Sequence, residues 1–207
     1  TYYRAIVKNG VCTAETTVVY TVNVDPTSVA GTASATSNTT LCTGSTTSLS
    51  LAGSVGSIQW QSSSDGNTYN NISGATSSTY TKTNLTASTY YRAVVTSGLC
   101  TSVESDPVFI TIIQNPTVSA AGADQTLCIS AVLATLTGNT PSVGTGQWSI
   151  VSGGTGTFSN SASPTSTFEP ADTGVYTLRW TISSNPCNPS SDDVVITFKA
   201  LPTTANA

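Results

Sequence analysis

The sequence predicts an all-β protein made of tandem β-sandwich domains in an elongated array. Three observations support this prediction: an internal repeat, a series of alternating apolar runs that each end at a proline, and a composition rich in Ser and Thr. The segment TYYRAIVKNGVC at residues 1–12 returns as TYYRAVVTSGLC at residues 89–100. Self-similarity at a fixed period indicates an array of similar folded units.

The composition favours strands over helices. Only 16 of the 207 residues are charged, and the chain has no His and no Met. Ser and Thr make up roughly a third of the residues, far above average usage. Thr, Val, Ile and Tyr favour half-buried strands, whereas Gly, Asn, Asp, Ser and Pro favour tight turns. No window shows a sustained helical period, so we expect many short strands.

The proline-terminated runs divide the chain into repeats. VVYTVNVDP ends at Pro26, VFITIIQNP at Pro116 and VVITFKALP at Pro202, so the prolines are almost evenly spaced. Proline marks strand ends because it cannot donate to a sheet ladder. We therefore expect the chain to be an excerpt of a longer array with four parts: the C-terminal part of a truncated repeat at 1–24, complete repeats at 25–113 and 114–199, and a linker or start of the next repeat at 200–207.

The strands of the first complete repeat follow from alternation and turn residues. We expect strands, in chain order, at 46–54, 57–63, 77–85, 88–97 and 107–113, with SSDGN and SG as turns. Trp60 lies in the second of these strands, after Cys42, and Tyr91 lies near the start of the fourth. A core Trp and a corner Tyr in this order are typical of an immunoglobulin-like sandwich.

The second complete repeat has the same arrangement in clearer form. ADTGVYTLRW has the Asp-x-Gly-x-Tyr form of a tyrosine corner at Tyr176, and Leu178 and Trp180 alternate with it along one strand. Alternate residues of a strand point to one face, so we expect these side chains and Trp148 to lie in the core.

The five cysteines follow the repeat. Each complete repeat contains two, at nearly the same separation along the chain. We predict structural disulfides Cys42–Cys100 and Cys128–Cys187, and we expect Cys12 to be unpaired because its partner precedes residue 1. A metal site is the alternative, but it calls for close C-x-x-C or His spacing. Paired cysteines indicate an oxidising, extracytoplasmic setting.

Two long runs resemble a known class of repeats. WQSSSDGNTYNNISGATSSTYTKTNLTASTYYRAVV resembles the Ig-like repeats of giant cell-surface adhesins of Bacteroidota, and AGADQTLC with GTGQWSIVSGGTGTFSNSASPTSTFEPADTGVYTLRWTI resembles their PKD-like repeats. Such adhesins are exported by the type IX secretion system and include gliding-motility adhesins of the SprB type. The resemblance implies an extracellular, cell-surface location, a role in cell adhesion or gliding motility, and no catalytic activity and no cofactor. Antibody domains place the second cysteine two residues after the corner Tyr; here Ala93 and Leu178 stand there.

The sequence gives only weak signals for nucleic-acid binding, membrane insertion, catalysis, metal binding or sugar binding. Six basic residues without a cluster argue against nucleic acid, and no apolar run is long enough to insert into a membrane. Without His or an S-x-x-K motif we expect no catalytic residues and no resident metal. Asp65 and Asp124 in turns are the best candidates for Ca²⁺ binding, while Tyr69 and Tyr90 are the candidates for stacking on a sugar. The other carboxylates that could form a glycosidase pair or a Ca²⁺ site are Glu169, Asp172, Asp192 and Asp193.

The prediction for function is a stalk or spacer of a large secreted adhesin. Its partners would be neighbouring repeats of the same long chain and, through a distal tip, a surface polysaccharide or abiotic surface. An alternative is a carbohydrate-binding or accessory module of a secreted polysaccharide-degrading enzyme. A third hypothesis gives each repeat weak adhesion that is multiplied over many copies.

Overall fold

The computed structural model describes residues 1–128 and 133–202, and within these ranges the chain forms twenty strands and no helix. The predicted all-β fold class is confirmed. Residues 203–207 of the expected segment 200–207 lie outside the described residues. The chain divides into two compact units: residues 1–37, 47–82 and 89–109 form the first, and residues 38–46, 83–88 and 110–207 form the second.

Residues 1–24 form a long hairpin without a second layer. Its strands pair antiparallel as β1 with β4 and β2 with β3: β1 Tyr2–Tyr3, β2 Ile6–Val7, β3 Glu15–Thr16 and β4 Tyr20–Thr21. Tyr3 is 59% exposed, whereas Tyr91, its counterpart in the repeat, is 3% exposed. The same sequence pattern therefore buries its apolar face only where an opposing sheet covers it.

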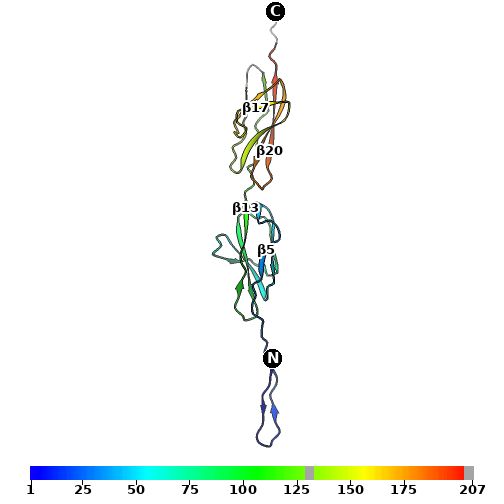
Figure 1. Cartoon of the computed structure of the whole chain (residues 1–207), viewed down its shortest axis with the longest axis vertical. Helices are drawn as coiled ribbons and strands as arrows, with labels where there is room; N and C mark the ends of the chain where they lie inside the picture. Colours follow the sequence, from blue (N-terminus) through cyan, green and yellow to red (C-terminus); the bar gives the residue numbers. More distant parts are fainter. Residues whose placement is uncertain (129–132, 203–207) are drawn as a thin grey trace, which may run out of the picture. The chain divides into compact units, whose positions relative to one another are not determined.

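The segment 25–113 forms two sheets (Figure 1). The first has the order β10-β7-β5, with β5 Thr32–Ala35, β7 Thr47–Ala52 and β10 Thr79–Lys82. The second has the order β6-β13-β11-β8-β9, and β12 pairs with β11. Its strands are β6 Thr40–Cys42, β8 Ser57–Ser63, β9 Asn70–Asn71, β11 Thr89–Thr96, β12 Val103–Glu104 and β13 Val108–Ile113.

Aromatic rings from both sheets meet in the core of this sandwich. Trp60 of β8 is fully buried and lies 6.4 Å from Tyr80 of β10, which lies 6.0 Å from Tyr91 of β11. The Trp60 indole nitrogen donates a hydrogen bond of 2.9 Å to the carbonyl of Ser77. The buried indole N–H of Trp60 is therefore hydrogen-bonded, as buried polar groups in folded proteins generally are.

The segment 114–199 forms a second sandwich, which lies entirely in the second unit. One sheet has the order β14-β20-β19-β16: β14 Gln125–Cys128, β16 Thr145–Ser152, β19 Gly174–Ser183 and β20 Ser190–Lys199. The other has the order β15-β18-β17: β15 Ala134–Thr135, β17 Gly156–Phe158 and β18 Thr167–Pro170. Phe168 of β18 lies 5.4 Å from Tyr176 and 6.3 Å from Phe198, so its ring joins the two sheets.

A tyrosine corner fixes the turn that leads into β19. The Tyr176 hydroxyl donates a hydrogen bond of 3.1 Å to the carbonyl of Asp172 and accepts one of 3.3 Å from its amide. The Tyr176 side chain is 1% exposed, so these bonds form within the packed sandwich. The corner therefore uses the backbone amide and carbonyl of Asp172.

Removing this hydroxyl gives a first prediction. Tyr176→Phe is expected to lower the free energy of unfolding by about 1 kcal/mol, because both backbone groups of Asp172 lose a partner while the ring keeps its packing. Urea denaturation followed by circular dichroism measures the change. Tyr20→Phe, on an exposed hairpin strand, is the matched control and should change stability little. Equal effects in the two variants would contradict a structural role for the corner.

Candidate functional site: the disulfide and its surroundings

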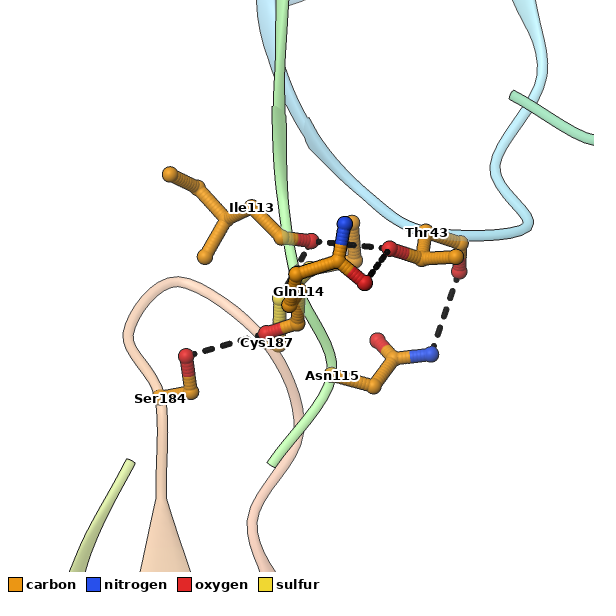
Figure 2. The surroundings of a disulfide bond; sticks show 7 residues. Thr43, Ile113, Gln114, Asn115, Ser184 and Cys187 are labelled. Atoms are coloured by element: carbon orange, nitrogen blue, oxygen red, sulfur yellow. Dashed lines mark hydrogen bonds between the residues drawn. A yellow bond between two sulfur atoms is a disulfide. The ribbon is translucent and has the colours of Figure 1, made fainter. Parts of the chain in front are cut away.

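One disulfide joins Cys42 to Cys187 across a sequence separation of 145 residues. Cys42 is the last residue of β6, and Cys187 lies in the loop between β19 and β20 (Figure 2). Their Cα atoms are 5.6 Å apart, within the usual range for a disulfide. Both cysteines belong to the second compact unit. The bond therefore fastens β6, which comes from the segment 25–113, to a loop of the segment 114–199.

The predicted pairings Cys42–Cys100 and Cys128–Cys187 are wrong. Cys128 lies opposite Lys199 at the end of β20, whereas Cys187 precedes the start of that ten-residue strand. At about 3.3 Å per residue the two positions are about 30 Å apart, far beyond the reach of a disulfide. Cys42 is bonded to Cys187 and Cys100 has a free thiol, so the predicted Cys42–Cys100 bond does not form. Cys12, Cys100 and Cys128 have free thiols.

Hydrogen bonds surround the disulfide on both sides of the segment that follows β13 (Figure 2). The Thr43 hydroxyl lies 3.3 Å from the Ile113 carbonyl oxygen and 3.1 Å from Oε1 of Gln114. The Asn115 side-chain amide donates to the carbonyl of Thr43 at 3.1 Å. The Ser184 hydroxyl donates to the carbonyl of Gln114 at 3.0 Å. Residues 113–115 are thus held by the loop of each cysteine, and the covalent bond adds to these polar contacts.

A second cluster lies on the outer face of the sheet formed by β11, β8 and β13. Because Tyr91 points into the core, Tyr90 and Arg92 point outward. The Arg92 guanidinium lies 3.9 Å from the centre of the Tyr69 ring and forms an ion pair with Glu104. The Tyr90 ring stacks on Phe109, with centroids 4.2 Å apart. Of the two sugar-stacking candidates, Tyr69 therefore has one ring face covered by Arg92 and Tyr90 has one covered by Phe109.

The predicted Ca²⁺ candidates hold backbone amides instead of gathering together. Asp65 Oδ1 accepts hydrogen bonds from the amides of Asn67 and Thr68, each at 2.9 Å, and from the Ser63 hydroxyl at 2.8 Å. Asp124 Oδ1 accepts a bond of 2.8 Å from the amide of Val195. Each carboxylate thus organises its own turn, and within residues 1–128 and 133–202 no three metal-ligating side chains cluster.

The other carboxylates are also separated. Asp192 accepts a hydrogen bond of 2.7 Å from the amide of Ala121, whereas Asp193 binds Arg179 through both oxygens at 2.7 and 2.9 Å. The two acids point to opposite faces of β20, as alternation predicts. Glu169 lies on β18 and Asp172 lies in the tyrosine corner. The structure therefore does not bring these four acids together as a set.

The Asp65 turn gives a pH-dependent prediction. Its backbone amide bonds, chiefly those from Thr68 and Asn67, lower the pKa of Asp65 from 3.8 to about 2. A depressed pKa in the folded state means that the turn stabilises the fold above pH 4 and loses this contribution as the pH falls from about 4 to about 2. NMR titration of the Asp65 carboxyl should give the low midpoint. Asp65→Asn should make the acid loss of stability shallower, and an unshifted midpoint would contradict the turn geometry.

A comparison with known protein families matches one part of the chain. A family model described as "Domain of unknown function (DUF8696)" matches residues 29–114, which is less than half of the chain. None of the curated protein sequences compared with the chain matches it. In the described part of the chain, no helix has the length and hydropathy needed to cross a membrane.

Several solved structures are similar to the chain at low identity. The insect immune protein hemolin has 14% identity and a TM-score of 0.47, covering 96% of this chain and 56% of that one. The PKD domain of the KIAA 1837 protein has 19% identity and a TM-score of 0.37, covering 43% and 92%. A Ca²⁺-stabilised adhesin with which an Antarctic bacterium binds ice has 13% identity and a TM-score of 0.38, covering 97% and 57%. The chain thus spans little more than half of the hemolin and adhesin structures.

Proposed function

We propose that this chain is a load-bearing stalk segment of a large secreted, cell-surface adhesin, with 25–113 and 114–199 as complete repeats and 1–24 as part of another. The observation that carries this proposal is the parallel pairing of an early strand with the last strand in each repeat. In the segment 25–113, β6 pairs in parallel with β13, and in 114–199, β14 pairs in parallel with β20. The sandwich fold supports a repeat role, and the adhesin role rests on this mechanical argument.

Parallel pairing suits a protein that is pulled along its chain. When the Cys42–Cys187 bond is reduced, tension from the N-terminal side reaches β14 directly, and β6 after β5, and it leaves each sandwich at its last strand. The paired strands are therefore pulled in opposite directions along one ladder. All ladder hydrogen bonds then share the load: three residue pairs between β6 and β13, from Thr40↔Thr111 to Cys42↔Ile113, and four between β14 and β20. An antiparallel hairpin pulled at its open end would instead release its bonds one after another.

The disulfide supports the same role. While Cys42 and Cys187 are joined, tension passes through the covalent bond from β6 to the β19–β20 loop and bypasses β13 and β14. The two parallel ladders therefore bear the load only after the bond is reduced, as a second line of resistance. A disulfide also persists outside the cytoplasm, where a surface stalk works.

Cell labelling tests the adhesin role directly. An antibody against residues 25–199, applied to living source cells, should stain the cell surface. Label that travels along the cell would favour a gliding adhesin exported by type IX secretion, and static label a fixed adhesin. Label found only in the medium would contradict the stalk proposal.

The outer face of β11 favours a second candidate, a carbohydrate-binding accessory module. Tyr69, Tyr90 and Phe109 present aromatic rings beside Arg92 on one sheet face. Rings and a guanidinium of this kind can stack on sugars and donate hydrogen bonds to them. Pull-down on insoluble polysaccharides, compared with Tyr90→Ala and with Tyr20→Ala as an exposed control, distinguishes this role. Equal retention of all three proteins would exclude it.

A further inference from the structure

Cys100 and Cys187 lie in matching structural positions. Each follows the long strand of its sandwich, β11 or β19. The amide of Cys100 donates to the carbonyl of Ser97 at 2.9 Å, and that of Cys187 to Ser184 at 2.8 Å. The sulfur of each lies near a carbonyl oxygen much earlier in the chain: Pro26 at 3.5 Å for Cys100 and Ile113 at 3.7 Å for Cys187. The Cys100 thiol thus occupies the place that Cys187 occupies when bonded.

Cys128 and Cys42 match in the same way. Each is the last residue of the strand that pairs in parallel with the last strand of its segment. Cys42 lies opposite Ile113, and Cys128 lies opposite Lys199, so the two pairs have the same separation along the chain. Cys128 therefore occupies the place that Cys42 occupies when bonded, and its side chain is exposed.

We infer that the disulfide Cys42–Cys187 is one instance of a bond that recurs between successive copies of the repeat. In this bond the strand-end cysteine of one copy pairs with the loop cysteine of the next. Cys128 would pair with the loop cysteine of a following copy, and Cys100 with the strand-end cysteine of a preceding copy. Cys12 forms the same turn, with its amide 3.1 Å from the carbonyl of Asn9, and is a loop cysteine too.

The chemistry is ordinary disulfide formation. Two thiols lose two protons and two electrons and form one S–S bond. A disulfide oxidant such as glutathione disulfide accepts the two electrons and two protons by thiol–disulfide exchange, and its own S–S bond breaks to give two thiols. This covalent pattern belongs to the repeat itself and does not require an adhesin role.

A tandem protein tests the inference. Residues 1–202 are joined to residues 27–207, which keeps the natural Pro–Thr junction of the repeats. Its nine cysteines are oxidised with glutathione disulfide, and the monomer is alkylated and mapped by mass spectrometry. We expect a new bond between Cys128 of the first copy and Cys100 of the second. Together with Cys42–Cys187 in each copy, this makes three disulfides. They use six of the nine cysteines and leave three free thiols.

The other outcomes are distinct. Five free thiols would mean that only the two Cys42–Cys187 bonds form, which overturns the inference. One free thiol would mean pairing within each repeat, which overturns both the inference and the observed bond. Cys128→Ser in the first copy of the tandem should raise the count from three to four by freeing Cys100 of the second copy. A count of two in that variant would also overturn it, because a third bond would then form without Cys128 of the first copy.

Discussion

Pulled from its two ends in a force-spectroscopy experiment, the chain is expected to extend about 500 Å further after reduction than before it. The disulfide joins residues separated by 145 positions, so the chain between Cys42 and Cys187 cannot extend while the bond is intact. Each extended residue contributes about 3.3–3.6 Å, and the locked segment accounts for the whole difference. Contour-length analysis of the traces with and without a reductant measures it.

Cysteine variants separate this bond from the pairing that the repeat alone predicts. Cys42→Ser should release the whole locked length without reductant. A bond between Cys42 and Cys100 would instead release only the shorter stretch between them, or about 200 Å. Cys12→Ser, Cys100→Ser and Cys128→Ser remove free thiols and should leave the oxidised trace unchanged. An equal contour length before and after reduction would contradict the disulfide.

The same bond should stabilise the fold in solution. In the chain-entropy account, closing a loop of this size stabilises the folded state by about 5 kcal/mol. Thermal unfolding of Cys42→Ser and Cys187→Ser should therefore occur at clearly lower temperature than that of Cys128→Ser. Each variant loses one sulfur atom, and Cys42 and Cys128 are both the last residue of a strand, so this pair compares loss of the bond with loss of a free thiol.

Sequence patterns were sufficient for the sandwiches but not for the bond. Alternation along a strand decides which side chains point inward, so Trp60, Tyr91, Trp148, Tyr176 and Trp180 could be placed from sequence alone, and all five are buried. Pairing of cysteines depends on which strand ends meet in space. Cys128 and Cys187 belong to one repeat, yet the length of β20 separates them. The period of the repeat shows which cysteines recur, but it does not show which copy of the repeat supplies the disulfide partner of each.

The outer-face cluster shows a related limit. Alternation in TYYRAVV predicts that Arg92 points away from the core once Tyr91 points into it. It does not predict that Tyr69, which comes much earlier in the chain, lies under the guanidinium. That contact depends on the path of the loop between β8 and β9, where turn residues were evident but the direction of the loop was not. The Asp65 turn within this loop was expected as a turn, and its hydrogen bonds explain the lowered pKa of Asp65.

Trp180→Ala is expected to cost about 4 kcal/mol of the stability of the second unit. The indole is fully buried, lies 5.1 Å from the ring of Trp148, and donates a hydrogen bond of 3.1 Å to the carbonyl of Asn139. Its removal leaves a large cavity and an acceptor without its donor, two costs that add. Urea denaturation followed by far-UV circular dichroism measures the loss. Val175→Ala, on the same strand but 55% exposed, should change stability by less than about 0.5 kcal/mol.

Gly146 provides an internal test of this packing. A Cβ atom at Gly146 would lie 2.1 Å from Cζ2 of Trp180, so Gly146→Ala should destabilise the native protein strongly. In the Trp180→Ala background the clashing ring is gone, and the same substitution should cost much less because it fills part of the cavity. The two variants should therefore be strongly non-additive in a double-mutant cycle. Additive costs would mean that the indole does not occupy the position over Gly146 on which the core of this sandwich depends.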